Sequence, residues 1–167
     1  MTLAEIVRTS TISFAFVGAG AFASVPKVWA DTATANVAVT TTVTVNCTVT
    51  TSPLTFGPYN VNDTSGLDGA GRVTLACTKG VQPTIALGAG NNSNRTMNGP
   101  GSERLIYELY QDSNRSSVWS ASAPGVMTPA QAPSKAARDF TVYGRVPSGQ
   151  DVSAGSYSDQ VAATINF

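Results

Sequence analysis

The sequence predicts an all-β protein built as a sandwich of short antiparallel strands, and three observations support this fold class. Residues 157–167 alternate apolar and polar side chains up to the carboxyl terminus, which is the period of a half-buried strand. The same alternation runs from Ala35 to Val49, longer than one ordinary strand of about 5–6 residues, so part of it is expected to pair in a neighbouring molecule. After residue 30 there is no sustained three-four spacing of apolar residues, which an amphipathic helix would show.

The first thirty residues have the pattern of an export signal. Arg8 gives a weakly positive start, residues 12–23 are apolar and uncharged, and Val28-Trp29-Ala30 places a small residue at the cut. We predict cleavage after Ala30, with cleavage after Ala23 as the alternative. A transmembrane anchor is disfavoured because a span needs about 20 apolar residues, and this run is interrupted from Ser24 onward.

The predicted mature part is one domain with almost balanced charge. It has 137 residues, enough to bury a core, and its eight basic and nine acidic side chains give a net charge of −1. This balance offers no basic footprint for nucleic acid and no polybasic patch for anionic lipid. Weak repulsion between copies suits close packing in an assembly.

Strand-like runs separated by loops of breaker residues follow along the chain. After the first run we predict strands over residues 54–59, 72–78, 83–87, 105–111, 117–120, 140–146 and the terminal segment. The loops at 60–71, 88–101 and 121–135 are rich in glycine, asparagine or proline. The glycine runs at 66–71 and 88–90 open no predicted helix that could hold a phosphate, so we interpret them as turn glycines. About seven short strands of this spacing are typical of a β-sandwich.

Cys47 and Cys77 are the two cysteines of the chain. In an oxidising compartment an isolated pair is most simply a disulfide, which we predict here. Each occupies an inward position of a predicted strand, and closing a loop of about thirty residues restricts the unfolded chain by roughly 3–4 kcal/mol. Metal binding or a redox pair is the rival interpretation, disfavoured because the chain has no histidine and no C-x-x-C spacing.

No residue pattern predicts catalysis, cofactor binding or a metal site. The chain contains no histidine, which removes the commonest general base and the usual partner of a serine nucleophile. Ser134-Lys135 are adjacent in a proline-rich loop, and Glu103 and Glu108 fall on opposite faces of a strand. Asparagine-rich stretches offer oxygens for calcium but no twelve-residue ligand loop. We therefore predict that the protein is not an enzyme and uses no cofactor.

Motifs spread in order through the predicted mature chain resemble those of one family. The matching pieces are Cys47-Thr48-Val49, Leu54-Thr55-Phe56-Gly57-Pro58-Tyr59, Val73-Thr74-Leu75-Ala76-Cys77, Ile85-Ala86-Leu87-Gly88-Ala89-Gly90, Arg95-Thr96-Met97, Leu105-Ile106-Tyr107-Glu108-Leu109-Tyr110-Gln111-Asp112, Trp119, Val142-Tyr143-Gly144-Arg145-Val146, Ala154-Gly155-Ser156-Tyr157-Ser158-Asp159 and Ile165-Asn166-Phe167. Together they resemble the spore coat protein U family, which includes the pilin subunits of archaic (Csu-type) chaperone–usher pili. One departure is Ser120 after Trp119, where the family commonly has glycine; it affects a turn and no functional residue.

The resemblance implies an incomplete immunoglobulin-like β-sandwich that lacks its final strand. A donor strand from a neighbouring subunit or from a chaperone completes such a fold by strand addition. On this basis residues 1–30 are the signal peptide, residues 31–42 the N-terminal donor-strand extension, and residues 43–167 the spore coat U or pilin domain.

The resemblance also implies which side chains meet. We expect Ala35, Val37 and Val39 to enter the groove of a partner, with residues 40–42 as a hinge. The subunit's own first strand is then expected to begin with Val43, Val45 and Cys47. The acceptor groove is expected to have a floor of apolar residues from the first and last strands. The best candidates for this groove and for the chaperone contact are Val161, Ala163, Ile165 and Phe167, with the terminal carboxylate bound by basic residues of the chaperone.

These expectations define a function and its alternatives. We predict a secreted structural subunit of a surface pilus or fimbria, assembled by donor-strand exchange through the chaperone–usher pathway and supporting adhesion and biofilm formation. Its partners are homologous pilin subunits, a periplasmic chaperone and an outer-membrane usher, with no nucleic acid or small-molecule substrate, and its path runs through the periplasm to the cell surface. The alternative is a protective spore or cell-surface coat protein. A tip adhesin is less favoured because receptor-binding tips generally need a second domain.

Overall fold

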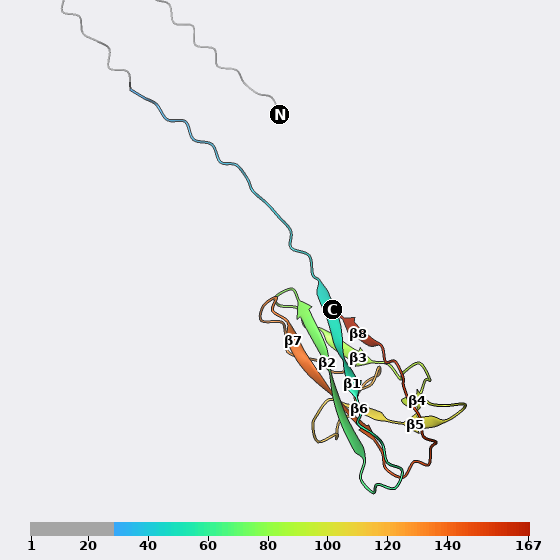
Figure 1. Ribbon diagram of the computed structural model, residues 1–167. Coiled ribbons are helices and arrows are strands. Elements are labelled where there is room, and N and C mark those ends of the chain that lie inside the picture. Colours follow the sequence, from blue (N-terminus) through green and yellow to red (C-terminus); the bar gives the residue numbers. More distant parts are fainter. Residues whose placement is uncertain (1–28) are drawn as a thin grey trace, which may run out of the picture. The chain divides into compact units, whose positions relative to one another are not determined.

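The computed structural model describes residues 29–167; residues 1–28, which hold most of the predicted export signal, lie outside the described part. Within residues 29–167 there are eight strands and no helix (Figure 1). The strands are β1 (Cys47–Thr55), β2 (Leu67–Cys77), β3 (Thr84–Leu87), β4 (Thr96–Asn98), β5 (Arg104–Ile106), β6 (Glu108–Tyr110), β7 (Arg138–Val146) and β8 (Ala163–Asn166). All eight belong to the compact unit Thr41–Phe167. The predicted all-β fold class is confirmed.

Every strand pair in this unit is antiparallel, and the strands form three sheets. The largest sheet has the order β1-β2-β7-β6, while β3 pairs with β8 and β4 pairs with β5. The longest ladder joins β2 to β7, from Leu67 opposite Val146 to Leu75 opposite Arg138. β1 and β8 therefore each have a strand partner on one side only.

The core lies between the large sheet and the smaller ones. Val73 and Leu75 of β2, Val146 of β7 and Ile85 of β3 are fully buried in one apolar cluster. Side chains two residues apart on a strand share a face, which is why the alternation in the sequence predicts them as core. Trp119 joins the cluster without exposed surface, and its indole N–H donates to the Ile85 carbonyl at 2.9 Å. Burying each such side chain contributes about 1.5–3 kcal/mol.

Several strand boundaries differ from the predictions. The strand predicted over residues 54–59 is the end of β1 and stops at Thr55, β2 begins at Leu67 inside the predicted loop 60–71, and the terminal strand covers only Ala163–Asn166. Hydrogen-bond partners explain two further differences. The first strand begins at Cys47 rather than at Val43, because β2 ends opposite Cys47 and its ladder extends no further. The predicted strand 105–111 is divided into β5 and β6 at Tyr107. The Tyr107 N–H still donates to the Arg95 carbonyl at 2.9 Å, on the β4 side, and the chain pairs with β7 only from Glu108 onward.

Two other segments differ in kind from their prediction. β4 arises inside the predicted loop 88–101, because this stretch folds back to pair with β5. The predicted strand 117–120 is reduced to a single bridge between Tyr110 and Val118. Local composition does not reveal either result, since both depend on which distant segment supplies the partner.

Gly71 and Gly144 lie in the paired strands β2 and β7, so the interpretation of the 66–71 run as turn glycines is wrong where the run enters β2. They make room for Leu54, near the end of β1, and for Phe56 just after it. A Cβ at Gly71 would lie 2.7 Å from the Leu54 Cβ, and one at Gly144 would lie 2.7 Å from the Phe56 Cζ. Glycine permits this close approach, which holds two apolar side chains over the sheet.

Loops and one side chain cover several strand edges. The Gln150 amide closes β5: the Ile106 N–H donates to Gln150 Oε1 at 2.7 Å, and Gln150 Nε2 donates to the Ile106 carbonyl at 3.0 Å. Met127 covers the edge of β3 through two main-chain hydrogen bonds with Ile85. Ser158 covers the edge of β4 through two main-chain hydrogen bonds with Asn98. An uncovered edge is a template for pairing with another chain, so these contacts restrict where such pairing can occur.

Candidate functional site

An apolar cleft of about 1450 Å³ crosses the compact unit. Residues 51–61, at the end of β1 and beyond, form the β1 wall, and residues 152–163, which lead into β8, form the C-terminal wall. Its floor includes the core side chains Val73, Met97, Leu105, Leu109, Val142 and Val146. Small-molecule pockets commonly have about 300–1,000 Å³, so this cleft has room for an extended peptide segment.

The C-terminal wall presents an open strand edge. The Ala162 carbonyl accepts a hydrogen bond from the Gly88 N–H at 2.8 Å, on the side of β3. Successive residues of a strand point their main-chain groups to opposite sides. The N–H and C=O groups of Val161, Ala163 and Ile165 therefore point away from β3, and no strand within residues 29–167 pairs with that side.

β1 presents the second open edge. The Thr78 N–H donates to the Asn46 carbonyl at 2.9 Å, so the main-chain N–H and C=O groups of the even-numbered residues at the start of β1 point toward β2. The main-chain groups of Cys47 and Val49 point to the other side, where the described part of the chain supplies no partner strand. Val49 lies opposite the fully buried Leu75 in the ladder, yet it is 41% exposed. An apolar side chain on the core-facing side of β1 thus lacks a cover.

Asp159 fixes the position of the C-terminal wall. The Tyr107 hydroxyl donates to Asp159 Oδ2 at 2.7 Å, and the main-chain N–H groups of Asn91 and Gln160 donate to Oδ1 at 3.0 and 2.8 Å. Gly90 has a φ of 89°, and a Cβ there would overlap the Asp159 carboxylate. Burial, followed by the hydrogen bond to Asp159, raises the pKa of the Tyr107 hydroxyl far above its ordinary value. The hydroxyl therefore remains a donor at neutral pH.

Aromatic side chains connect the β1 wall to the floor of the cleft and to the turn after β7. The ring of Phe56 lies 6.3 Å from the ring of Tyr107, centroid to centroid. The Tyr59 hydroxyl donates to the Pro147 carbonyl at 3.1 Å and accepts a hydrogen bond from the Gln150 N–H at 2.8 Å. These contacts attach the far end of the β1 wall to the turn that follows β7.

The four predicted acceptor residues have different positions. Val161 and Ala163 line the cleft. Ile165 packs against the core cluster beyond it, while Phe167 is 58% exposed and does not line the cleft. The floor comes mainly from internal strands rather than from the first and last strands, because the cleft opens onto the core that both layers share.

Tyr107 and Asp159 are not among the site residues that the sequence predicts. Tyr107 alternates with Leu105 and Leu109 in the sequence, which places the three side chains on one face of a strand, and a buried hydroxyl needs a hydrogen-bond partner. Asp159 is the single acidic residue of the terminal segment 157–167. A tyrosine on an apolar strand face and a lone carboxylate near the last strand are the sequence features that could have indicated this pair. Only the fold brings the two side chains together.

The predicted donor residues lie in the other unit, which ends at Thr40. Residues 29–46 form no strand. Ala35 is exposed, and Val37 and Val39 are 85% and 91% exposed. Large apolar side chains at alternating positions therefore remain without cover in the described chain.

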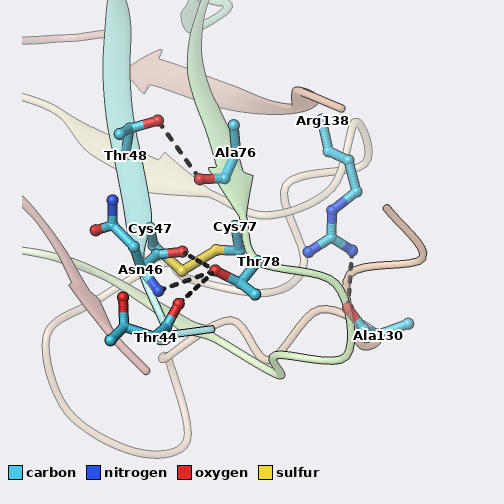
Figure 2. The surroundings of a disulfide bond; sticks show 9 residues. All are labelled: Thr44, Asn46, Cys47, Thr48, Ala76, Cys77, Thr78, Ala130 and Arg138. Atoms are coloured by element: carbon cyan, nitrogen blue, oxygen red, sulfur yellow. Dashed lines mark hydrogen bonds between the residues drawn. A yellow bond between two sulfur atoms is a disulfide. The ribbon is translucent and has the colours of Figure 1, made fainter. Parts of the chain in front are cut away.

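Cys47 and Cys77 form a disulfide, as the sequence predicts (Figure 2). They are directly opposite in the β1–β2 ladder, with Cα atoms 4.1 Å apart. The adjacent Thr78 hydroxyl accepts a hydrogen bond from the Asn46 N–H at 3.0 Å. These contacts fasten the start of β1, whose other edge is open, to the end of β2.

The described residues include no group of three or more His, Cys, Asp or Glu side chains placed to bind a metal ion. No helix within residues 29–167 has the length and hydropathy needed to cross a membrane.

The buried guanidinium of Arg95 donates to the carbonyls of Leu87 at 3.1 Å and Trp119 at 2.8 Å. This cation thus holds core segments together.

Comparisons with known proteins give the family. Residues 33–164 match the Spore Coat Protein U domain. Protein U of Myxococcus xanthus is 31% identical over 133 residues, which cover 68% of this chain and 69% of that protein. A chain in the crystal structure of the CsuC-CsuE chaperone-tip adhesion subunit pre-assembly complex, from archaic chaperone-usher Csu pili of Acinetobacter baumannii, has a similar fold. The TM-score is 0.59 at 20% identity, over 75% of this chain and 41% of that chain, so our protein spans about two fifths of this neighbour's length. The chain therefore belongs to the spore coat protein U family.

Proposed function

We propose that this protein is a secreted structural subunit of a surface pilus, assembled by donor-strand exchange through the chaperone–usher pathway and supporting adhesion and biofilm formation. One observation carries the proposal: an apolar cleft of about 1450 Å³ lies between two strand edges that have no partner strand within residues 29–167. Such a cleft is the space of one missing strand.

An inserted strand fits this cleft better than a small molecule does. Main-chain groups of Val161 and Ala163 on one wall, and of Thr51 on the other, need hydrogen-bond partners once water is excluded. A strand supplies a regular row of N–H and C=O groups to both edges. Its alternate side chains would at the same time cover the apolar floor.

The segment 31–42 has the properties of the donor. Ala35, Val37 and Val39 are spaced by two, so in an extended strand they share one face. All three are exposed here, which leaves them available to fill the cleft of the next subunit. Residues 40–42 then serve as the hinge, and the domain is 43–167.

Export and assembly partners complete the proposal. Residues 1–30 act as the signal peptide, a periplasmic chaperone lends a strand to the cleft before assembly, and an outer-membrane usher delivers the subunit to the growing fibre. The exposed Phe167 at the carboxyl terminus is available to basic residues of the chaperone. The structural neighbour comes from a chaperone–subunit pre-assembly complex, which supports a partner of this kind. The role is structural, without catalysis or a cofactor.

A protective coat protein is the second candidate. The matched domain is the Spore Coat Protein U domain, and Protein U of Myxococcus xanthus is a relative. The same cleft and extension could join subunits within a layer instead of a fibre. Electron microscopy of cells with and without this protein separates the two, since a pilus appears as filaments and a coat as a continuous layer.

A matched pair of substitutions tests the donor role in cells that also express the chaperone and usher. Val37→Asp places a charge on the face that enters the cleft, while Ala38→Asp places the same charge on the opposite face. We expect the first variant to abolish the ladder of polymers on unheated denaturing gels, and the second to retain it. Equal loss, or no loss in either variant, would contradict the donor assignment.

A further inference from the structure

The two walls of the cleft run in opposite directions. β1 starts at Cys47, beside the end of β2. From the end of β2 a short connection leads to β3, whose first residue, Thr84, lies opposite Asn166 at the end of β8. The start of β1 and the end of β8 therefore lie at the same end of the domain. Figure 1 shows the start of β1 and the carboxyl terminus at the same end of the domain. Past the other end of β1, Phe56 meets Tyr107, which binds Asp159 upstream of β8. A strand inserted between the walls is therefore parallel to one and antiparallel to the other.

This geometry restricts how the chain's own extension could fill the cleft. The extension joins the domain at the start of β1, so it would have to reverse and form a hairpin with β1. Tight hairpins need positive φ angles, which asparagine and glycine adopt readily. Residues 40–45 are all threonine or valine, whose β-branched side chains disfavour such a turn.

Thr78 adds a direct restraint on residues 44–46, the segment that joins the extension to β1. We call this segment the root of the extension. The Thr78 N–H donates to the Asn46 carbonyl at 2.9 Å, and the Thr78 hydroxyl accepts from the Asn46 N–H at 3.0 Å. The hydroxyl proton has two acceptors, the carbonyls of Thr44 at 3.4 Å and Asn46 at 3.3 Å. Figure 2 shows the Thr78 hydroxyl at the centre of these contacts, next to the Cys47–Cys77 disulfide. Both main-chain groups of Asn46 are thus bound on the β2 side, in line with β1.

We propose that Thr78 is a clamp that keeps the root of the extension from turning back, so that a subunit cannot fill its own cleft. The occupant is then residues 35–39 of a second copy of this chain. The inference rests on the proposed function, because it takes the extension as the strand that fills the cleft. Thr78 acts through the root and contacts no part of the cleft, so its role is one of positioning.

The test distinguishes contacts within one chain from contacts between chains. Isotope-labelled and unlabelled full-length mature proteins are mixed, refolded and allowed to assemble, with a photo-cross-linking residue at Asn36. Cross-links from the extension to the C-terminal wall that join labelled to unlabelled peptides come from two copies. Four proteins are compared: the parent, Thr78→Val, Thr78→Ser as the control that keeps the hydroxyl, and Val45→Asn with Asn46→Gly, which supplies a hairpin turn.

We expect cross-links of mixed isotope in the parent and in Thr78→Ser. Thr78→Val should raise the ratio of same-chain to between-chain cross-links by roughly tenfold, the effect of losing about one hydrogen bond. The Val45→Asn, Asn46→Gly variant should form monomers whose share does not depend on concentration.

Same-chain cross-links in the parent, or an unchanged ratio in Thr78→Val, would overturn the clamp while leaving donor-strand exchange intact. Absence of any cross-link to the C-terminal wall in all four proteins would instead count against the proposed function. The two failures are therefore separable.

Discussion

The Tyr107 hydroxyl donates a 2.7 Å hydrogen bond to the Asp159 carboxylate and so joins the floor of the cleft to its C-terminal wall. Tyr107 is buried between β5 and β6, and Asp159 precedes the open edge formed by Val161 and Ala163. The main-chain N–H groups that bind the same carboxylate come from the turn after β3 and from the wall itself. One side chain therefore sets the position of the edge on which an incoming strand would pair.

Removal of this acceptor should loosen the wall. We expect Asp159→Ala to lower the free energy of unfolding by about 1.5–3 kcal/mol, because hydrogen bonds to a charged group are lost and the Tyr107 hydroxyl is left buried without its partner. Asp159→Asn keeps a carbonyl acceptor and should lose less. Urea unfolding followed by tryptophan fluorescence, at one protein concentration, measures both; equal stability of parent and Asp159→Ala would contradict the assigned role.

Alkaline pH should destabilise the domain through Tyr107. Burial and the bond to Asp159 raise the pKa of this hydroxyl in the folded state. Its stabilising contribution is therefore complete below the pKa of an unfolded tyrosine, about 10, and is lost as the pH rises further. Thermal unfolding between pH 8 and pH 11 should show a decline for the parent that is shallower in Tyr107→Phe. Parallel profiles for the two proteins would show that another group is responsible.

A methyl group added at Gly71, which lies beneath Leu54, should lower the stability of the domain. In Gly71→Ala the new Cβ would lie 2.7 Å from the Leu54 Cβ, so the end of β1 must shift, at a cost of about 1–3 kcal/mol. The matched control is Gly57→Ala, where the nearest atom to an added Cβ is 4.0 Å away. Calorimetry should show a lower melting temperature for the first variant and little change for the second. The opposite order would mean that Leu54 is not held against the sheet.

Loss of the disulfide should destabilise the domain more than loss of any single hydrogen bond. Cys47 and Cys77 are separated by 30 residues, and opening a loop of that size costs about 3–4 kcal/mol on the entropy model. The double variant Cys47→Ala, Cys77→Ala should therefore unfold at a much lower urea concentration. The parent in reducing agent provides the comparison, and agreement between the two shows that the bond rather than the side-chain change is responsible. No effect of either treatment would contradict this prediction.

Patterns that depend on local spacing were predictable from the sequence. The alternation of Val73, Leu75 and Cys77 fixed the inward face of β2, and the lone cysteine pair gave the disulfide. Both follow from the two-residue period of a strand and from the oxidising compartment that a signal segment implies. The ordered motifs gave the family, which the match over residues 33–164 confirms.

Features that depend on which segments meet in space were not predictable. The glycines near residue 70 have turn-like composition, and only the overlying Leu54 and Phe56 show why a strand needs them. The cleft floor draws on strands far apart in the chain, so the terminal alternation pointed to Val161 and Ala163 but also to the exposed Phe167. Nothing in the sequence pairs Tyr107 with Asp159.

Gln150 imitates a peptide group when its amide binds both main-chain groups of Ile106. The consequence concerns dimensionality. A subunit that joins its neighbours only through the cleft and the extension forms an assembly that grows along one axis. A free edge on β5 would let strands of neighbouring assemblies pair laterally. On the proposed donor-strand assembly, Gln150→Ala is thus expected to add lateral association between fibres, which light scattering would register as a steeper growth of mass with time.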